Sequence, residues 1–180
     1  PKSVEVLVRI RASTLVFQYL LMTQGIYQHK PDLPYLVASE LSGSLVQLAP
    51  DVTGLATGDN LVGCNFTGSF PAYVVFTASE LRQLPAAFSY AQGAATTSAY
   101  LTAYVSLFRR GYLQAGEWVL VHGAAGGVGL AAVDLAKGAG AKVIVAGSSD
   151  AKLARVQKAF EGGAVVNVTN GFRGRVKEIN

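Results

Sequence analysis

Residues 119–129, V-L-V-H-G-A-A-G-G-V-G, constrain the fold of this chain more than any other segment. The run predicts a buried strand, a glycine-rich turn and the start of a helix. Ala124, Gly126 and Gly129 stand at the three fixed places of the dinucleotide fingerprint G-x-G-x-x-G, with alanine in the first. A second apolar strand over 142–146 follows at the spacing of a βαβ unit. This context favours a turn that binds a dinucleotide pyrophosphate over a plain strand-to-helix turn without a ligand.

The small residues of this turn have separate roles in the predicted site. Gly126 and Gly127 let the backbone approach phosphate oxygens, because neither carries a Cβ. Gly129 allows the helix to pack closely on its strand. Ala125 and Val128 present backbone N–H groups, and the N-terminus of the helix adds a partial positive charge. The turn is therefore expected to hold an anionic phosphate group.

The end of the second predicted strand distinguishes NADP from NAD. A fold that prefers NAD usually places an acidic residue here, about 20 residues after the glycines, to accept from the ribose 2′-hydroxyl. In this chain Ser148 and Ser149 follow the strand, no acid occurs before Asp150, and Lys152 comes next. Serine donates hydrogen bonds and lysine supplies charge, so the segment favours a 2′-phosphate and hence NADPH. Alternatively, Ser148 and Asp150 cap the next helix and Lys152 is a solvated surface residue.

Composition and charge exclude several other classes of protein. The chain is 51% hydrophobic and 14% charged, and it lacks an apolar run long enough for a transmembrane helix, so no membrane partner is expected. The net charge is +4, but the basic residues are scattered, which favours an anionic cofactor over a nucleic acid. A single cysteine, Cys64, excludes an internal disulfide and fits a reducing compartment, the cytoplasm or the mitochondrion. One cysteine and two separated histidines predict no metal site.

The chain divides into a β-rich first half and an alternating second half. Short β-branched or aromatic runs predict strands at 4–10, 41–48, 60–64 and 72–76, with a short helix at 14–24. The predicted order then becomes one or two helices over 90–110, strand 118–122, helix 127–137, strand 142–146, helix 150–160, strand 164–168 and helix 172–179. The first half predicts a compact β-barrel-like domain. The alternation in the second half predicts a parallel sheet with helices on its faces.

The predicted parallel sheet is short. Three parallel strands can be counted, whereas a complete dinucleotide fold of this type has about six. We therefore expect the sheet to stop near its middle and to leave one face or edge bare unless another chain covers it. The chain also opens directly into a predicted strand without an initiating methionine. The predicted organisation is an N-terminally incomplete first domain, residues 1–95, and a C-terminally incomplete second domain, residues 96–180.

These residues resemble a known family. The chain is similar to the zinc-free quinone oxidoreductase branch of the medium-chain dehydrogenase/reductase superfamily, the zeta-crystallin-like proteins. The glycine turn and Thr102-Ala103-Tyr104 are specific in combination, whereas the scattered glycines are not. The matching segments are 24–27, 34–43, 52–54, 58–59, 102–104, 113–117, 121–130 and 148–152.

The resemblance implies an α/β protein in which a β-rich, GroES-like catalytic domain precedes a Rossmann domain that binds NADPH. The family reaction is hydride transfer from NADPH to a quinone or a related activated enone, and the cofactor carries most of the chemistry. Two alternatives stay open: a non-catalytic, crystallin-like protein that binds NADPH, and a reductase of alkenal or enoyl double bonds. The full-length form is expected to be a homodimer, and no catalytic residue is assigned.

The resemblance also implies which residues contact NADPH. Residues 125–128 would meet the pyrophosphate. Gly147, Ser148 and Lys152 would surround the phosphate of the adenosine ribose, and Thr102 would lie near the nicotinamide.

The chain departs from the family at several positions. The family's polar Asn and Asp, which line the active-site cleft, are here Val16 and Tyr19. A Pro-Gly before the Ser-Glu pair is here Val37-Ala38. A tyrosine or histidine that often follows the asparagine of the third strand is here Val168. The substrate side and the adenine side therefore both differ from the family pattern.

Overall fold

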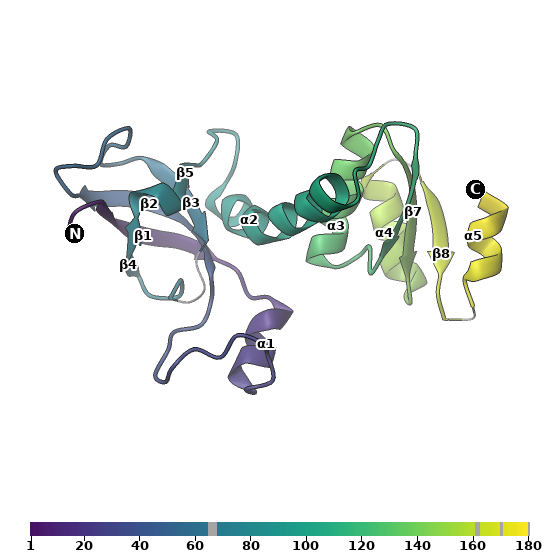
Figure 1. Cartoon of the computed structure of the whole chain (residues 1–180), viewed down its shortest axis with the longest axis horizontal. Coiled ribbons are helices and arrows are strands. Elements are labelled where there is room, and N and C mark those ends of the chain that lie inside the picture. Colours follow the sequence, from purple (N-terminus) through teal and green to yellow (C-terminus); the bar gives the residue numbers. More distant parts are fainter. Residues whose placement is uncertain (65–67, 161–162, 170, 180) are drawn as a thin grey trace. The chain divides into compact units, whose positions relative to one another are not determined.

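The structure, a computed structural model, describes residues 1–64, 68–160, 163–169 and 171–179 (Figure 1). The chain forms two compact units, residues 1–97 and 98–180. This division falls inside helix α2 (Tyr90–Tyr104), and the predicted boundary after residue 95 falls in the same helix. The two units are described separately below.

The first unit is built on an antiparallel sheet of five strands in the order β4-β1-β2-β3-β5. The four predicted strands and the short helix are confirmed, and a fifth strand, only three residues long, escaped prediction. The elements are β1 (Glu5–Ser13), α1 (Phe17–Thr23), β2 (Glu40–Leu48), β3 (Asn60–Cys64), β4 (Tyr73–Thr77), a 3-10 turn (Ala78–Glu80) and β5 (Leu81–Gln83).

Alternating apolar residues form the main core of this unit. Val6 and Val8 of β1 are fully buried, and Val8 pairs with Leu45 of β2. Because successive side chains of a strand point to opposite faces, the residues at every second position meet on one side of the sheet. The buried cluster is Val6, Val8, Leu41, Leu45, Leu61, Phe76 and Leu81.

A smaller core holds helix α1. Tyr19 and Met22 of this helix are buried together with Ala38. The backbone of Ala38 is left-handed, with φ of 74°, a conformation that costs an alanine about 1 kcal/mol and a glycine nothing. Ala38 stands where the family pattern has glycine, so the chain keeps a glycine-like conformation without the glycine.

The second unit alternates strands and helices, as predicted. Its parallel sheet has the order β6-β7-β8. The predicted helical segment 90–110 is α2 followed by a π-helical turn that ends before Gly111. The elements after α2 are the π-helical turn (Val105–Arg110), β6 (Trp118–His122), α3 (Gly127–Gly138), β7 (Lys142–Gly147), α4 (Asp150–Ala159), β8 (Ala164–Asn167) and α5 (Arg173–Ile179).

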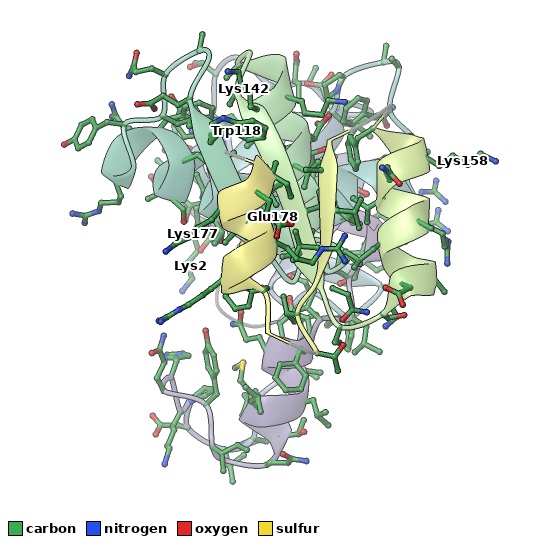
Figure 2. All side chains as sticks on the ribbon, turned by 90° about the vertical axis from the view of Figure 1, so that its right-hand side faces the viewer. Lys2, Trp118, Lys142, Lys158, Lys177 and Glu178 are labelled. Atoms are coloured by element: carbon green, nitrogen blue, oxygen red, sulfur yellow. The ribbon has the colours of Figure 1, made fainter. Side chains whose placement is uncertain are left out.

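Strand β7 is the centre of this unit. Four of its six residues are buried, and both α3 and α4 pack against it. Strand β6 pairs with β7 along one edge, and within the described residues no strand pairs with its other edge. At the start of these two strands the Lys142 Nζ lies 5.5 Å from the ring centroid of Trp118 (Figure 2). In the described part of the sheet, the unpaired edge of β6 is the bare edge that the sequence predicts.

None of the helices in the described ranges is long and apolar enough to span a membrane.

Candidate functional site

The glycine turn after β6 is tight and is hydrogen-bonded to β7. Gly123 takes a left-handed conformation with φ of 62°, which glycine adopts without steric cost. The Gly126 N–H donates to the Gly123 carbonyl at 2.9 Å and closes the turn. The Ala124 N–H donates to the Ala146 carbonyl at 3.1 Å. The turn therefore lies at the carboxyl ends of two parallel strands, where ligands bind in open α/β sheets.

Two glycines of the turn have opposite surroundings. A Cβ placed on Gly129 would collide with the Gly123 carbonyl and would lie 2.7 Å from the Ala124 Cα. Gly129 thus allows α3 to approach its strand closely, as the sequence interpretation held. A Cβ on Gly127 would have no atom within 4 Å. One glycine is required by packing, and the other keeps open space above the turn.

Helix α3 begins on this turn with unpaired donors. Its N-cap is Gly126, which has no side chain to accept from the first backbone N–H groups. Those groups lack intrahelical partners, and the helix dipole adds a partial positive charge at the same end. The turn therefore offers donors and positive potential to an anion.

A cavity joins the turn to the end of β7. Its volume is about 290 Å³, and we call it the Lys152 cavity. Five of the eight residues predicted to contact the cofactor line it: Ala125, Gly126, Gly147, Ser148 and Lys152. Gly123, Ser149 and Leu153 complete the lining. Two segments at least 21 positions apart in sequence thus meet around one cavity.

The other predicted contacts lie elsewhere. Gly127 and Val128 line a second cavity of about 480 Å³ along the free edge of β6, together with Gly126. Thr102 lies on α2, is exposed, and lines neither cavity. Its carbonyl accepts a hydrogen bond from the Ser106 hydroxyl at 2.8 Å. The structure therefore does not bring Thr102 to the Lys152 cavity.

Ser149, rather than Ser148 or Asp150, caps helix α4. Its hydroxyl accepts from the Lys152 N–H at 3.5 Å, so the capping alternative for the other two residues is wrong. The Asp150 carboxylate instead accepts from the Asn167 amide at 2.7 Å. Sequence reasoning missed Ser149, although a serine just before a helical run is a standard N-cap signal. Ser148 is left to line the cavity, and Asp150 is engaged by β8.

Val16 and Tyr19, the two positions that line the active-site cleft in the family, lie in the first unit. Tyr19 is only 2% exposed, and it lies in the small core beside α1. Its hydroxyl lies 2.6 Å from the Ser39 hydroxyl and accepts from the Ser39 N–H at 2.7 Å. Val16 is 37% exposed at the N-cap of α1. Tyr19 therefore does not line an open cleft, because burial and two hydrogen bonds hold it inside the unit.

Among the described residues, no group of three or more His, Cys, Asp and Glu side chains is placed to hold a metal ion.

Comparisons with known proteins agree with this geometry. Residues 2–86 match the alcohol dehydrogenase GroES-like domain. The chain is 36% identical, over 177 residues, to the quinone oxidoreductase-like protein 2 homolog of Nematostella vectensis, and the match covers 97% of this chain and 48% of that protein. The chain thus spans about half the length of this relative.

Two solved structures have the same fold. A probable oxidoreductase from Mycobacterium abscessus superposes with a TM-score of 0.92 at 35% identity, over 99% of this chain and 57% of that one. The Escherichia coli quinone oxidoreductase in complex with NADPH superposes with a TM-score of 0.87 at 32% identity, over 98% of this chain and 54% of that one. Over nearly its whole length the chain is therefore similar to quinone oxidoreductases of the medium-chain dehydrogenase/reductase superfamily.

Proposed function

We propose that this chain binds NADPH at the glycine turn and the Lys152 cavity, and that the whole protein reduces a quinone or a related activated enone. The observation that carries the proposal is the cavity, which joins the turn to Ser148 and Lys152. The Escherichia coli quinone oxidoreductase, which is similar to this chain, was solved with NADPH. The proposal extends that ligand to this chain on the strength of its own residues.

The residues of the cavity fit the phosphates of NADPH. The backbone of residues 125–128 would bind the pyrophosphate, because the start of α3 offers N–H groups there. The Ser148 hydroxyl and the Lys152 ammonium group, which line the same cavity as Gly147, would bind the 2′-phosphate. Asp150, the first acid after the strand, accepts from Asn167 and does not line the cavity. This arrangement favours NADPH over NADH.

In the proposed reaction the cofactor supplies the chemistry and the chain supplies the positioning. The nicotinamide supplies the hydride when NADPH is bound. The residues of this chain bind and orient the two phosphate groups, which places the ring relative to the acceptor. Thr102 is proposed to lie on the nicotinamide side, on the resemblance alone.

Cofactor binding is tested by thermal unfolding of the purified chain with NADPH or NADH. We expect NADPH to raise the unfolding temperature clearly more than NADH at equal concentration, because only NADPH has the phosphate that Ser148 and Lys152 contact. Lys152→Ala should weaken NADPH binding by about 1–3 kcal/mol and leave NADH binding unchanged. Equal shifts from both cofactors in the unaltered chain would contradict the phosphate argument.

Reduction is tested separately, by NADPH oxidation in the presence of quinones, enones, alkenals and enoyl thioesters. Turnover with quinones supports the proposed reaction, and turnover with the double-bond substrates alone would move the assignment to the alkenal or enoyl class. A non-catalytic role is favoured by one observation, the burial of Tyr19 at a position that lines the cleft in the family. Binding of NADPH without turnover of any of these acceptors would support that role.

A further inference from the structure

A third cavity adjoins the Lys152 cavity on the surface between α3 and α4. Its volume is about 370 Å³, and we call it the interhelix cavity. Ala125 and Lys152 line both cavities, so the two hollows meet at these residues. The remaining lining residues of the interhelix cavity are Leu130, Arg155, Val156 and Ala159. The proposed NADPH site does not account for this cavity or for Arg155.

Arg155 lies on the same face of α4 as Lys152. The two residues are three positions apart, a spacing that places side chains of a helix next to each other. Leu153 and Val156, on the neighbouring face, are buried against the sheet. Lys152 and Arg155 therefore flank the buried face along its length, with both charged ends exposed.

Nothing in the described part of the chain neutralises this pair of cations. No acidic residue lines either cavity. No hydrogen bond or ion pair joins the Arg155 guanidinium to another described residue. Asp150, the acid at the start of the same helix, lines neither cavity, and its carboxylate accepts from the Asn167 amide. The two adjoining cavities thus carry two positive charges and no compensating carboxylate.

The charge of a 2′-phosphate is balanced better by two cations than by one. A phosphate monoester carries a charge of about −1.5 to −2 at neutral pH, more than a single exposed ammonium neutralises. A guanidinium donates through a planar fork that matches the geometry of phosphate, whereas lysine acts as a point charge. The apolar lining from Leu130 and Val156 can hold the aliphatic stem of the arginine while its charged end reaches the cavity mouth.

We propose that Arg155 is a specificity-determining residue which, together with Lys152, binds the 2′-phosphate of an adenosine nucleotide. The inference rests on the proposed function, because it assigns a second cation to the phosphate end of the same site. It predicts that Arg155 contributes to the preference for a 2′-phosphorylated ligand and not to adenosine binding as such.

The test uses three probes that separate the phosphate from the nucleotide: adenosine 2′,5′-bisphosphate, adenosine 5′-monophosphate and inorganic phosphate. Each is titrated calorimetrically against the whole chain and its variants. We expect Arg155→Ala to weaken the bisphosphate about fivefold and to leave the monophosphate unchanged, an effect kept modest by solvent exposure. Arg155→Lys should recover part of the loss.

The matched control is Lys158→Ala, which removes one positive charge from the same helix. Lys158 lines neither cavity and projects outward from α4 (Figure 2). The control should bind all three probes as the unaltered chain does. Far-ultraviolet circular dichroism and thermal unfolding show that each variant is folded, which is expected because both positions are exposed.

Each outcome decides one of the two proposals. If Arg155→Ala behaves like Lys158→Ala while Lys152→Ala weakens the bisphosphate, the inference is wrong and the proposed NADPH site stands. If Arg155→Ala weakens all three probes alike, the residue acts through general charge and the inference is also wrong. If the unaltered chain binds the bisphosphate no better than the monophosphate, the proposed function fails and the inference fails with it.

Discussion

The glycine turn in the second unit leaves polar groups open to solvent, whereas the Ser39 segment in the first unit (Ser39 and Glu40) buries its polar side chains. At the turn, helix α3 starts on Gly126 without a side-chain cap, and a cavity opens over Ser148 and Lys152. In the Ser39 segment both side chains are buried, and each is bonded to a residue from another part of the first unit. Ser39 bonds to Tyr19, and the buried Glu40 carboxylate accepts from the Thr14 hydroxyl at 2.8 Å.

This difference separates polar groups that can bind from polar groups that hold the fold. A donor left open to solvent can exchange water for a ligand at little cost, whereas a buried group must keep its partner or lose its hydrogen-bond energy. Tyr19 stands where the family has a polar cleft residue, and here its side chain is buried and bonded to Ser39. The glycine turn therefore keeps open polar groups, and the Ser39 segment does not.

The largest expected effect comes from filling the space at Gly129. Gly129→Ala places a methyl group against the backbone of Gly123 and Ala124, which cannot move without disturbing the turn and its bond to β7. We expect unfolding to become easier by about 3 kcal/mol, at the upper end of overpacking in a dense interior. The free energy of unfolding from urea titration measures the effect.

Gly127→Ala is the matched control in the same helical turn. Its methyl group enters open space, so stability should stay within about 1 kcal/mol of the unaltered chain. The same methyl group occupies the room that the proposed pyrophosphate needs, and NADPH binding should weaken about tenfold. Equal losses of stability for the two alanine variants would break the distinction between a packing glycine and an open one.

The second largest effect on stability is expected from removing the buried hydrogen bonds between Tyr19 and Ser39. Tyr19→Phe removes the hydroxyl that meets both the hydroxyl and the N–H of Ser39, and leaves the buried N–H without this acceptor. We expect a loss of about 2 kcal/mol in the free energy of unfolding, the cost of an unsatisfied buried donor. Tyr112→Phe is the control, because Tyr112 is 73% exposed and its loss should stay within about 0.5 kcal/mol. A Tyr19→Phe protein as stable as this control would show that the buried hydroxyl contributes nothing to the fold.

Long periodic segments were predictable from sequence because their patterns are local. Strands β1, β2 and β7 follow from apolar runs of suitable length, and α3 and α4 follow from the spacing after each strand. Strand β5 has three residues, too few for an alternation to be visible. The left-handed backbone of Ala38 is set by the surrounding chain and leaves no mark on the residue itself.

The candidate site was predictable where it depends on backbone and less so where it depends on tertiary packing. The turn and the β7 end were placed together because carboxyl ends of parallel strands share one edge. The cap of α4 was displaced by one residue, a shift within the usual uncertainty of helix ends. Arg155 was missed, although its spacing from Lys152 was visible, because only the fold shows that a cavity lies beside both. The burial of Tyr19 likewise requires the position of Ser39, 20 residues away.

The smallest expected effect belongs to a polar pair formed by the half-buried Tyr100 of α2 and the exposed Asp134 of α3. The Tyr100 hydroxyl donates to the Asp134 carboxylate at 2.8 Å, and partial burial together with this bond raises the pKa of Tyr100 above its usual value. Because the folded pKa is raised, the stabilisation is complete below pH 10, the unfolded pKa, and is lost as pH rises through the folded pKa. Tyr100→Phe should cost about 0.5 kcal/mol at pH 8, discounted for solvent exposure, and nothing at a pH above both values. The difference in free energy of unfolding between the two proteins, measured from pH 8 to 11, tests this, and a difference that does not shrink with pH would exclude the hydrogen bond as its cause.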